Sequence, residues 1–365
     1  MKKIIQIEPW IDKSELDQLT RVVESTYVVE HNLTKEFEDL IKNMTGSRFA
    51  ISITNGTAAL YCCLKALGIG PGDEVIVPDL TFIATSNAVI MAGAKPVLCD
   101  VTNDTFCLDP KEISCLINKN TKAIIPVHLY GQSCDMYEIN KIAKKHNLYV
   151  VEDAAQGVGV KFDNKHVGTF GDLGILSFYG NKTITCGEGG IILTDDEELA
   201  KKCYRLKNHG RDKKGIFVHE HIGYNFCFTE MQAAIGIAQI GKLKFIIDAK
   251  KKIYEKYIKD LSEISEITIP YLDERTTPVH WFTSILTDKR DELIKFLNKK
   301  NIQTRLFFYP IHLQPCYNKN IVDIRQCKNS LAAFNTGVSL PSAYSLTQEQ
   351  QEYIINCIKE FFNEK

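Results

Sequence analysis

Short apolar runs of about five residues recur through the first half of the chain and form the strongest pattern in the sequence. Most of these runs are continuously apolar, which is typical of strands buried on both faces. Stretches with helical periodicity lie between them, at 109–118 and 133–145. This alternation predicts an α/β fold in which helices cover both faces of a mostly parallel sheet. The predicted strands are 49–53, 74–78, 96–100, 123–127, a run ending at 153, 174–176 and 189–194.

Apolar residues at helical spacing predict further helices around this core. In 12–24, Leu16, Leu19 and Val23 share one face, which we expect to pack against the protein. The charged helix 242–261 is expected to lead from a large domain, 1–245, into a small C-terminal domain, 246–365. The small domain is predicted to contain a strand at 279–286. The other predicted helices are 34–41, 231–240, 291–299 and 348–363.

The charge balance argues against several classes of partner. The formal net charge is −1 at pH 7, so the chain has no general attraction for nucleic acid or for an anionic membrane. Lysine runs such as 250–252 read as the solvated face of a helix. Gln6 and Glu8 interrupt any signal-peptide core, and no apolar stretch approaches the ~18 residues that span a bilayer. We therefore expect a cytoplasmic protein.

Cysteine and histidine give no metal-binding pattern. The 12 cysteines lie singly, apart from the adjacent pair Cys62 and Cys63, and none has CxxC spacing. We expect them to be free thiols of a cytosolic protein. His219 and His221 lack a third ligand at suitable spacing, so we interpret them as exposed loop residues and expect no metal.

One lysine stands in an unusual context. Lys182 lies between an apolar run that ends near Ser177 and the glycine-rich turn before Gly189. An ammonium held near the interior in such a connection loses solvation, which lowers its pKa and makes the free amine a nucleophile toward carbonyls. The alternative at this stage is an ordinary solvated loop lysine.

Asp153 offers a partner for this lysine. It ends the apolar strand that begins at Val150, and in α/β folds the carboxyl ends of strands open into the ligand-binding crevice. An aspartate in that place, with a lysine about 30 residues later, indicates pyridoxal phosphate. The lysine would form a Schiff base, and the aspartate would pair with the protonated pyridine nitrogen.

A glycine turn after the first predicted strand opens a helix. Gly56 and Thr57 place free backbone N–H groups and the positive end of the helix dipole together, an arrangement that binds phosphate. An ordinary capped helix would have the same sequence features. The residues alone leave both interpretations open.

Taken together, these motifs make the chain resemble the DegT/DnrJ/EryC1/StrS family of sugar aminotransferases over nearly its whole length. The resemblance implies fold type I of the pyridoxal phosphate enzymes, which is aspartate aminotransferase-like. That fold has a large domain with a mostly parallel seven-stranded sheet and a small C-terminal α/β domain. It also implies that Lys182 carries the cofactor and shuttles the proton, while Asp153 keeps the pyridine nitrogen protonated.

Further site residues follow from the same resemblance. Family positions that bind the cofactor phosphate match Gly56, Thr57 and Ser177, and Phe82 matches an aromatic residue that stacks on the pyridine ring. Gln156 matches a side chain that hydrogen-bonds the ring hydroxyl. Asn225 matches an asparagine that reaches across a homodimer to the cofactor phosphate of the other subunit, so the active sites would be shared.

The resemblance also implies the substrates. L-Glutamate would be the amino donor, and no metal is used. The sequence around Lys182 most resembles that of family members that aminate GDP-4-keto-6-deoxymannose for surface polysaccharide biosynthesis. The segment that returns to the substrate cleft matches 304–315, from which Arg305, Tyr309 and His312 are expected to contact substrate.

Two departures leave the acceptor open. Cys227 stands where relatives usually carry an arginine, and the stretch 317–337 does not follow the family pattern. Another keto-sugar nucleotide or a small phosphorylated ketone therefore remains an alternative acceptor. Lys182 argues against a related sugar dehydratase, which has histidine there, and the presence of both Lys182 and Asp153 argues against a non-catalytic homologue. A dehydrogenase would need a glycine-rich dinucleotide turn, which we do not find.

Overall fold

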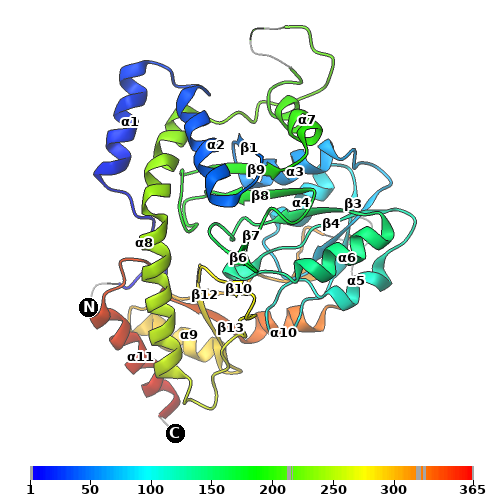
Figure 1. The fold of residues 1–365 in the computed structure, drawn as a ribbon. Helices are drawn as coiled ribbons and strands as arrows, with labels where there is room; N and C mark the ends of the chain where they lie inside the picture. Colours follow the sequence, from blue (N-terminus) through cyan, green and yellow to red (C-terminus); the bar gives the residue numbers. More distant parts are fainter. Residues whose placement is uncertain (1–2, 212–214, 216, 318–321, 324–325, 364–365) are drawn as a thin grey trace.

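A seven-stranded sheet forms the centre of the protein in the computed structural model, which describes residues 3–211, 215, 217–317, 322–323 and 326–363 (Figure 1). The strand order is β1-β9-β8-β5-β4-β2-β3. All neighbours pair in parallel except β9, which runs antiparallel between β1 and β8. The predicted α/β fold with a mostly parallel seven-stranded sheet is confirmed. The strands are β1 (Phe49–Ile53), β2 (Glu74–Pro78), β3 (Lys95–Cys99), β4 (Thr121–Ile124), β5 (Tyr149–Asp153), β8 (Leu173–Ser177) and β9 (Gly190–Thr194).

Helices cover both faces of this sheet because the strands carry apolar side chains toward both sides. Ile76 and Ile124 belong to the core shared with α2, α5, α6 and α8. Val75 and Ala123 belong to the core on the opposite face, with α3, α4 and α7. The helices are α2 (Asn32–Thr45), α3 (Gly56–Ala66), α4 (Ala84–Met91), α5 (Pro110–Leu116), α6 (Met136–His146), α7 (Glu197–Lys207) and α8 (Glu230–Leu261). Of these, α4 and α7 were not predicted.

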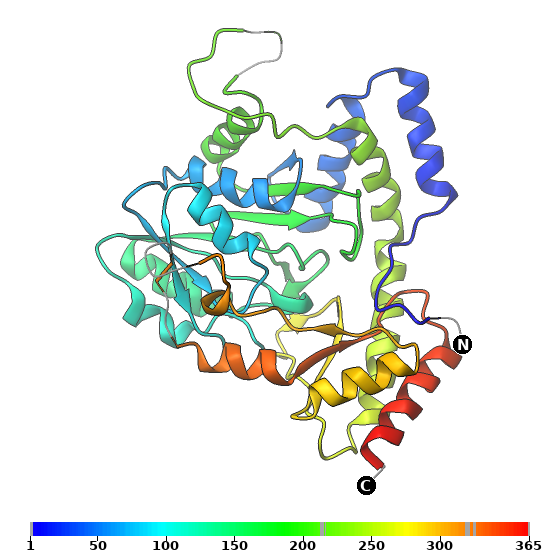
Figure 2. The same cartoon turned by 180° about the vertical axis from the view of Figure 1, so that it is seen from behind.

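A single long helix, α8, replaces the two helices predicted at 231–240 and 242–261. Gly241 lies where they were expected to meet, and no atom lies within 4 Å of a Cβ placed there. One glycine costs a helix only about 1 kcal/mol, which the burial of the surrounding apolar residues offsets. Figures 1 and 2 show α8 running from the sheet to the C-terminal elements, so it crosses the predicted boundary at 245.

One lysine of α8 was interpreted wrongly. Lys250 is only 3% exposed, although the run 250–252 was expected to face solvent as a whole. Its ammonium donates to the backbone oxygens of Trp281 at 3.1 Å and of Ser342 at 2.7 Å. The helix therefore presents this position to the C-terminal elements, while Lys251 and Lys252 remain exposed.

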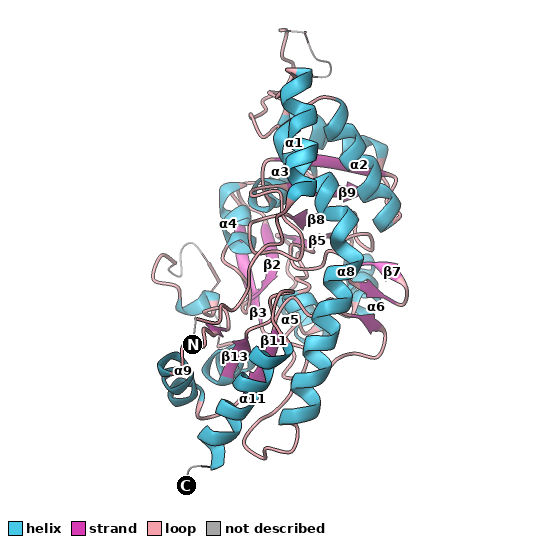
Figure 3. Cartoon of the chain, turned by 90° about the vertical axis from the view of Figure 1, so that its left-hand side faces the viewer, coloured by secondary structure: helices cyan, strands magenta, loops and turns pink. Residues whose placement is uncertain are grey.

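The C-terminal part has its own three-stranded antiparallel sheet, in the order β11-β13-β12. Ile285, Leu293 and Ile354 lie in its core. Figure 3 shows α9 and α11 at the end of the molecule opposite α1 and α2. The elements are β11 (Thr283–Leu286), α9 (Arg290–Lys299), β12 (Arg305–Leu306), α10 (Lys328–Thr336), β13 (Gly337–Leu340) and α11 (Gln348–Asn363).

The strand predicted at 279–286 is shorter than expected. Only Thr283–Leu286 pairs as β11. His280 has a φ of 45°, a left-handed conformation that ends an extended strand. The residues before β11 therefore form an irregular segment, which brings Trp281 to the site described below.

The first helix, α1 (Lys13–Ser25), lies against α8, and of its predicted buried face only Leu19 packs against the core. Leu16 and Val23 are 61% and 64% exposed, whereas Val22 and Glu15 are buried. The Glu15 carboxylate accepts hydrogen bonds from Gln239 and Lys242 of α8, each at 2.7 Å. A buried ion pair thus orients the helix, and apolar spacing alone could not reveal it.

A minor sheet of two-residue strands lies beside the main one, in the order β10-β6-β7. Its strands are β10 (Thr276–Thr277), β6 (Lys161–Phe162) and β7 (Lys165–His166). Within the described residues, no helix combines the length and apolar character needed to cross a membrane.

Candidate active site

A cavity of about 580 Å³ opens at the carboxyl ends of the parallel strands, the edge at which α/β sheets bind ligands. This volume lies in the range of sites for cofactors and small molecules. Its lining comes from the large sheet, from the first turn of α3 and from the C-terminal part of the chain. The structure brings together here the predicted residues Gly56, Thr57, Phe82, Asp153, Gln156, Ser177, Lys182 and Arg305.

Lys182 lies in the connection between β8 and β9, as the sequence predicted. Its backbone N–H donates to the Tyr179 oxygen at 2.9 Å, and its Nζ lies 4.4 Å from the centre of the Trp281 ring. Burial of the amine lowers the pKa of Lys182 to about 8; Asp153 opposes this shift and Arg305 adds to it. More of the free amine is therefore present near neutral pH than for an ordinary lysine.

Asp153 ends β5 and is 5% exposed. Its carboxylate accepts hydrogen bonds from the Thr85 hydroxyl at 2.8 Å and from the Ala155 N–H at 3.1 Å. Burial raises the pKa of Asp153, and the hydrogen bonds together with the charge of Lys182 partly oppose this effect. A buried carboxylate beside a cavity is stabilised by a cationic partner, which a protonated ring nitrogen would provide.

The first turn of α3 has the features expected of a phosphate site. Asn55 caps the helix by accepting the Ala58 N–H at 2.9 Å. A Cβ at Gly56 would lie 3.2 Å from the Ser177 Cβ and 3.4 Å from its hydroxyl, so glycine permits the close approach of helix and strand. The N–H groups of this turn and the Ser177 hydroxyl thus border the same part of the cavity, as a phosphate requires.

Gln156 and Phe82 are the remaining predicted cofactor residues that line the cavity. The Gln156 Oε1 accepts the Tyr130 N–H at 2.7 Å, which leaves the amide NH₂ as the donor for a ligand. Phe82 is 55% exposed, and its ring centre lies 5.9 Å from that of Phe308. Both side chains therefore offer the contacts that a planar ring with an acceptor oxygen needs.

Three predicted residues lie outside the lining of this cavity. Asn225 is exposed and forms an isolated β-bridge with Asn208. Tyr309 is 42% exposed. His312 donates its backbone N–H to Asp79 at 2.8 Å, and its ring nitrogen lies 2.7 Å from the other carboxylate oxygen. Within one chain, His312 thus holds the segment after β12 to the end of β2.

Asp79 and His312 also belong to the one group of metal-ligand side chains found among the described residues. Their ligand atoms and that of Cys327 lie within 4.8 Å of one another. The carboxylate and the imidazole are already hydrogen-bonded to each other, so each has a protein partner. His219 and His221 lie apart from this group and are exposed, as predicted.

The two departures from the family pattern lie as follows. The Cys227 thiol donates to the Lys207 backbone oxygen at 3.4 Å, so it points toward the end of α7. Of the stretch 317–337, residues 318–321 and 324–325 lie outside the described residues, and α10 occupies most of the remainder.

Sequence reasoning missed three residues of the site. Thr85 orients Asp153, Tyr130 orients Gln156, and Trp281 covers Lys182. Tyr130 has a φ of 53°, which is unusual for a residue other than glycine and occurs at functional sites. Trp281 is one of only two tryptophans in the chain, which is the signal that could have drawn attention to it.

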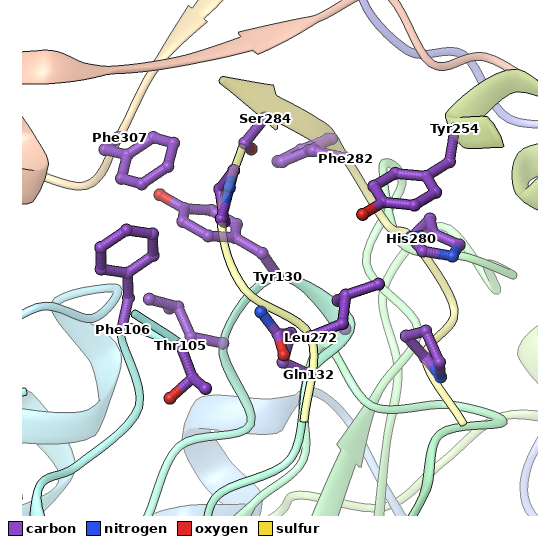
Figure 4. Close-up of a pocket in the computed structure, with 14 residues that line it drawn as sticks. Thr105, Phe106, Tyr130, Gln132, Tyr254, Leu272, His280, Phe282, Ser284 and Phe307 are labelled. Carbon is purple, nitrogen blue, oxygen red and sulfur yellow. The ribbon is translucent and has the colours of Figure 1, made fainter. Parts of the chain in front are cut away.

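A second, smaller cavity lies behind Tyr130, between the sheet and the C-terminal part (Figure 4). Its lining includes Phe106 and Tyr130 from the first half of the chain and Phe282 and Phe307 from the C-terminal part. Its volume is about 40 Å³, which is room for one or a few water molecules and not for a substrate.

The fold and the cavity together define the class of the protein: an aminotransferase with the aspartate aminotransferase-like fold. The chain belongs to the DegT/DnrJ/EryC1/StrS aminotransferase family, whose model matches residues 9–359. It is 39% identical to a GDP-perosamine synthase of Escherichia coli O157:H7 over 100% of both chains.

Solved structures agree with this assignment. The chain is similar to DesV of S. venezuelae in complex with a ketimine intermediate, with a TM-score of 0.95 and 30% identity over 100% of both chains. It is also similar to NtdA of Bacillus subtilis with bound cofactor PMP, with a TM-score of 0.89 and 31% identity. That match covers 99% of this chain and 86% of NtdA.

Proposed function

We propose that this enzyme uses pyridoxal 5'-phosphate to move an amino group from L-glutamate to a nucleotide-linked keto-sugar of the GDP-4-keto-6-deoxymannose type. The observation that carries the proposal is the meeting, in one cavity, of the Lys182 amine, the buried Asp153 carboxylate and the N-terminus of α3. In pyridoxal phosphate, the aldehyde would bond to the amine, the ring nitrogen would pair with the carboxylate, and the phosphate would bind at the helix N-terminus. The similarity to a GDP-perosamine synthase supports this choice of acceptor.

The residues of the cavity fit the cofactor. The N–H groups of Gly56 and Thr57 and the Ser177 hydroxyl would hold the phosphate, and the Gln156 amide would donate to the ring hydroxyl. Phe82 would stack on one face of the ring. When bound, the cofactor supplies an electron sink for the carbon that gains or loses its proton.

Two side chains would perform the chemistry beside it. The Lys182 amine would hold the cofactor covalently, leave it when the amino donor arrives, and then carry the proton between the two reacting carbons. Its lowered pKa, about 8, suits this exchange between base and acid near neutral pH. Asp153 would keep the ring nitrogen protonated through a charge-assisted hydrogen bond.

The acceptor would enter from the side of the cavity formed by the C-terminal part. Arg305 is exposed there, with its guanidinium 5.2 Å from the centre of the Phe282 ring. A guanidinium in that place can bind a carboxylate or a phosphate. This fits both an anionic amino donor and a nucleotide-linked sugar.

Peptide mapping tests the proposal. Protein purified with pyridoxal phosphate is expected to be yellow, and borohydride should reduce the bond so that the adduct remains on the peptide that contains Lys182. Lys182→Ala should abolish the reducible adduct, while Lys251→Ala, on the exposed face of α8, should retain it. An adduct on a different lysine would contradict the assignment.

A substrate screen tests the acceptor. Glutamate-dependent amination is expected with GDP-4-keto-6-deoxymannose and not with small phosphorylated ketones. If only another keto-sugar nucleotide is aminated, the proposed aminotransferase chemistry would stand and the proposed acceptor would be wrong.

A further inference from the structure

Trp281 contacts both Lys182 and the residue before it. The centre of its ring lies 4.4 Å from the Lys182 Nζ, and its indole N–H donates to the oxygen of Asn181 at 2.7 Å. The first contact involves the amine and the second the carbonyl of the preceding residue. Trp281 is 2% exposed and lines the cavity, so it forms a wall of the site.

The backbone of Trp281 is held from both parts of the chain. Lys250 of α8 donates to the Trp281 oxygen at 3.1 Å, and the Val279 N–H donates to the Gly131 oxygen at 3.3 Å. Gly131 has a φ of 87°, and a Cβ there would lie 3.2 Å from the Trp281 nitrogen. The segment before β11 therefore lies directly against Gly131, which leaves Trp281 little room to shift.

The indole ring is fixed as firmly as its backbone. It stacks on Phe282 with ring centres 4.0 Å apart and on Tyr130 with ring centres 6.4 Å apart. Figure 4 shows Tyr130 and Phe282 at the small cavity, which both of them line. Since Tyr130 also orients Gln156, one aromatic layer supports two residues of the cofactor site.

We propose that Trp281 is a positioning residue that orients the Lys182 amine for its bond to the cofactor. A lysine side chain is long and flexible, so a wall that restrains it raises the fraction of time that the nitrogen points at the aldehyde carbon. The inference rests on the proposed function. In the step concerned, the amine nitrogen bonds to the aldehyde carbon and the aldehyde oxygen leaves as water.

A comparison of two cofactor forms isolates this role. Pyridoxamine phosphate has no aldehyde and cannot bond to lysine, so its affinity reports only the non-covalent cradle. When pyridoxal phosphate is added to cofactor-free protein, the change in absorbance measures the rate of covalent capture by the lysine. Trp281→Ala is expected to slow capture by at least ~10-fold while the affinity for pyridoxamine phosphate stays within about twofold.

Two further variants make the comparison specific. Trp281→Phe keeps an aromatic face but loses the bond to Asn181, and is expected to slow capture by about threefold. Trp10→Phe is the matched control, because Trp10 forms a similar lysine–tryptophan pair outside the cavity lining. The Lys242 Nζ lies 4.9 Å from the centre of the Trp10 ring. The control variant should capture the cofactor at the wild-type rate.

Each other outcome overturns the inference. Capture at the wild-type rate in both Trp281 variants would show that Trp281 does not orient the Lys182 amine. An equal loss of pyridoxamine phosphate affinity and capture rate would show that Trp281 serves only the structure of the cavity. Failure of the wild-type protein to capture pyridoxal phosphate on Lys182 would instead contradict the proposed function.

Discussion

Lys182 and Asp153 line the same cavity, and burial shifts their pKa values in opposite directions. Burial disfavours the charged form of each, so it lowers the pKa of Lys182 to about 8 and raises the pKa of Asp153. The lysine thereby becomes a better nucleophile, whereas the aspartate comes to require a cation. A cofactor with an electrophilic carbon and a basic ring nitrogen satisfies both residues, which is why they are informative as a pair.

Asp153→Asn tests the aspartate. The amide should leave the covalent bond to Lys182 intact but should no longer favour a protonated ring nitrogen, so turnover should fall by at least ~100-fold. Single-turnover kinetics with glutamate, together with the borohydride assay, measure the two effects separately. Thr85→Val, which removes the hydroxyl hydrogen bonds to Asp153 and Thr81 but keeps the carboxylate, should have a smaller effect. Near-normal turnover of Asp153→Asn would assign the aspartate a purely structural role.

At the scale of elements, α8 connects the two parts of the chain. Its first half packs under the sheet, and its second half carries Lys250 to the backbone of Trp281 and Ser342. The C-terminal part therefore reaches the cofactor cavity through Trp281 and Arg305. The proposed division into 1–245 and 246–365 falls inside this helix, so any motion between the domains would involve α8.

Lys250 makes the stability of this junction depend on pH. Burial lowers its pKa to about 7, whereas the unfolded chain keeps the ordinary value of 10.5. Between these values the unfolded state binds more protons, so Lys250 makes the protein more stable as pH rises from 7 to 10. Relative to Lys250→Met, wild-type stability should increase by roughly 3 to 4 kcal/mol over this range.

Denaturant unfolding at several pH values measures this difference. Lys251→Met is the matched control, since Lys251 is exposed on the next position of the helix and should follow the wild-type curve. Parallel curves for wild type and Lys250→Met would show that Lys250 does not titrate in this range.

At the scale of the whole molecule, the place of Asn225 bears on the expected homodimer. Asn225 is exposed and lies outside the lining of its own cavity. Phe217 and Ile222 precede it in the same connection and are 81% and 85% exposed. Exposed apolar side chains of this size favour contact with another chain. Together with the family resemblance, this leads us to propose a homodimer in which Asn225 of each subunit contacts the cofactor phosphate of the other.

Asn225→Ala should weaken cofactor binding by roughly ten- to a hundredfold, because a hydrogen bond to a charged group is worth about 1.5 to 3 kcal/mol. Mixing this variant with Lys182→Ala provides the sharper experiment. In a heterodimer both defects fall in one site and the other site is intact, so activity should partly return.

The control is a mixture in which native mass spectrometry confirms heterodimers. If such heterodimers remain as inactive as their parents, Asn225 does not act across the interface.

The sequence by itself determined the central sheet and the places along it of the residues proposed to hold the cofactor. Continuous apolar runs mark strands buried on both sides, and the positions of Asp153, Lys182 and Gly56 follow from the ends of those strands, which are local features. Only the tertiary structure decided which face of α1 is buried, that Lys250 is inside, and that Trp281 meets Lys182. These depend on contacts between residues far apart in the chain, such as Glu15 with Lys242 and Trp281 with Asn181. Because packing and ion pairs between distant residues override local spacing, no periodicity in the sequence records them.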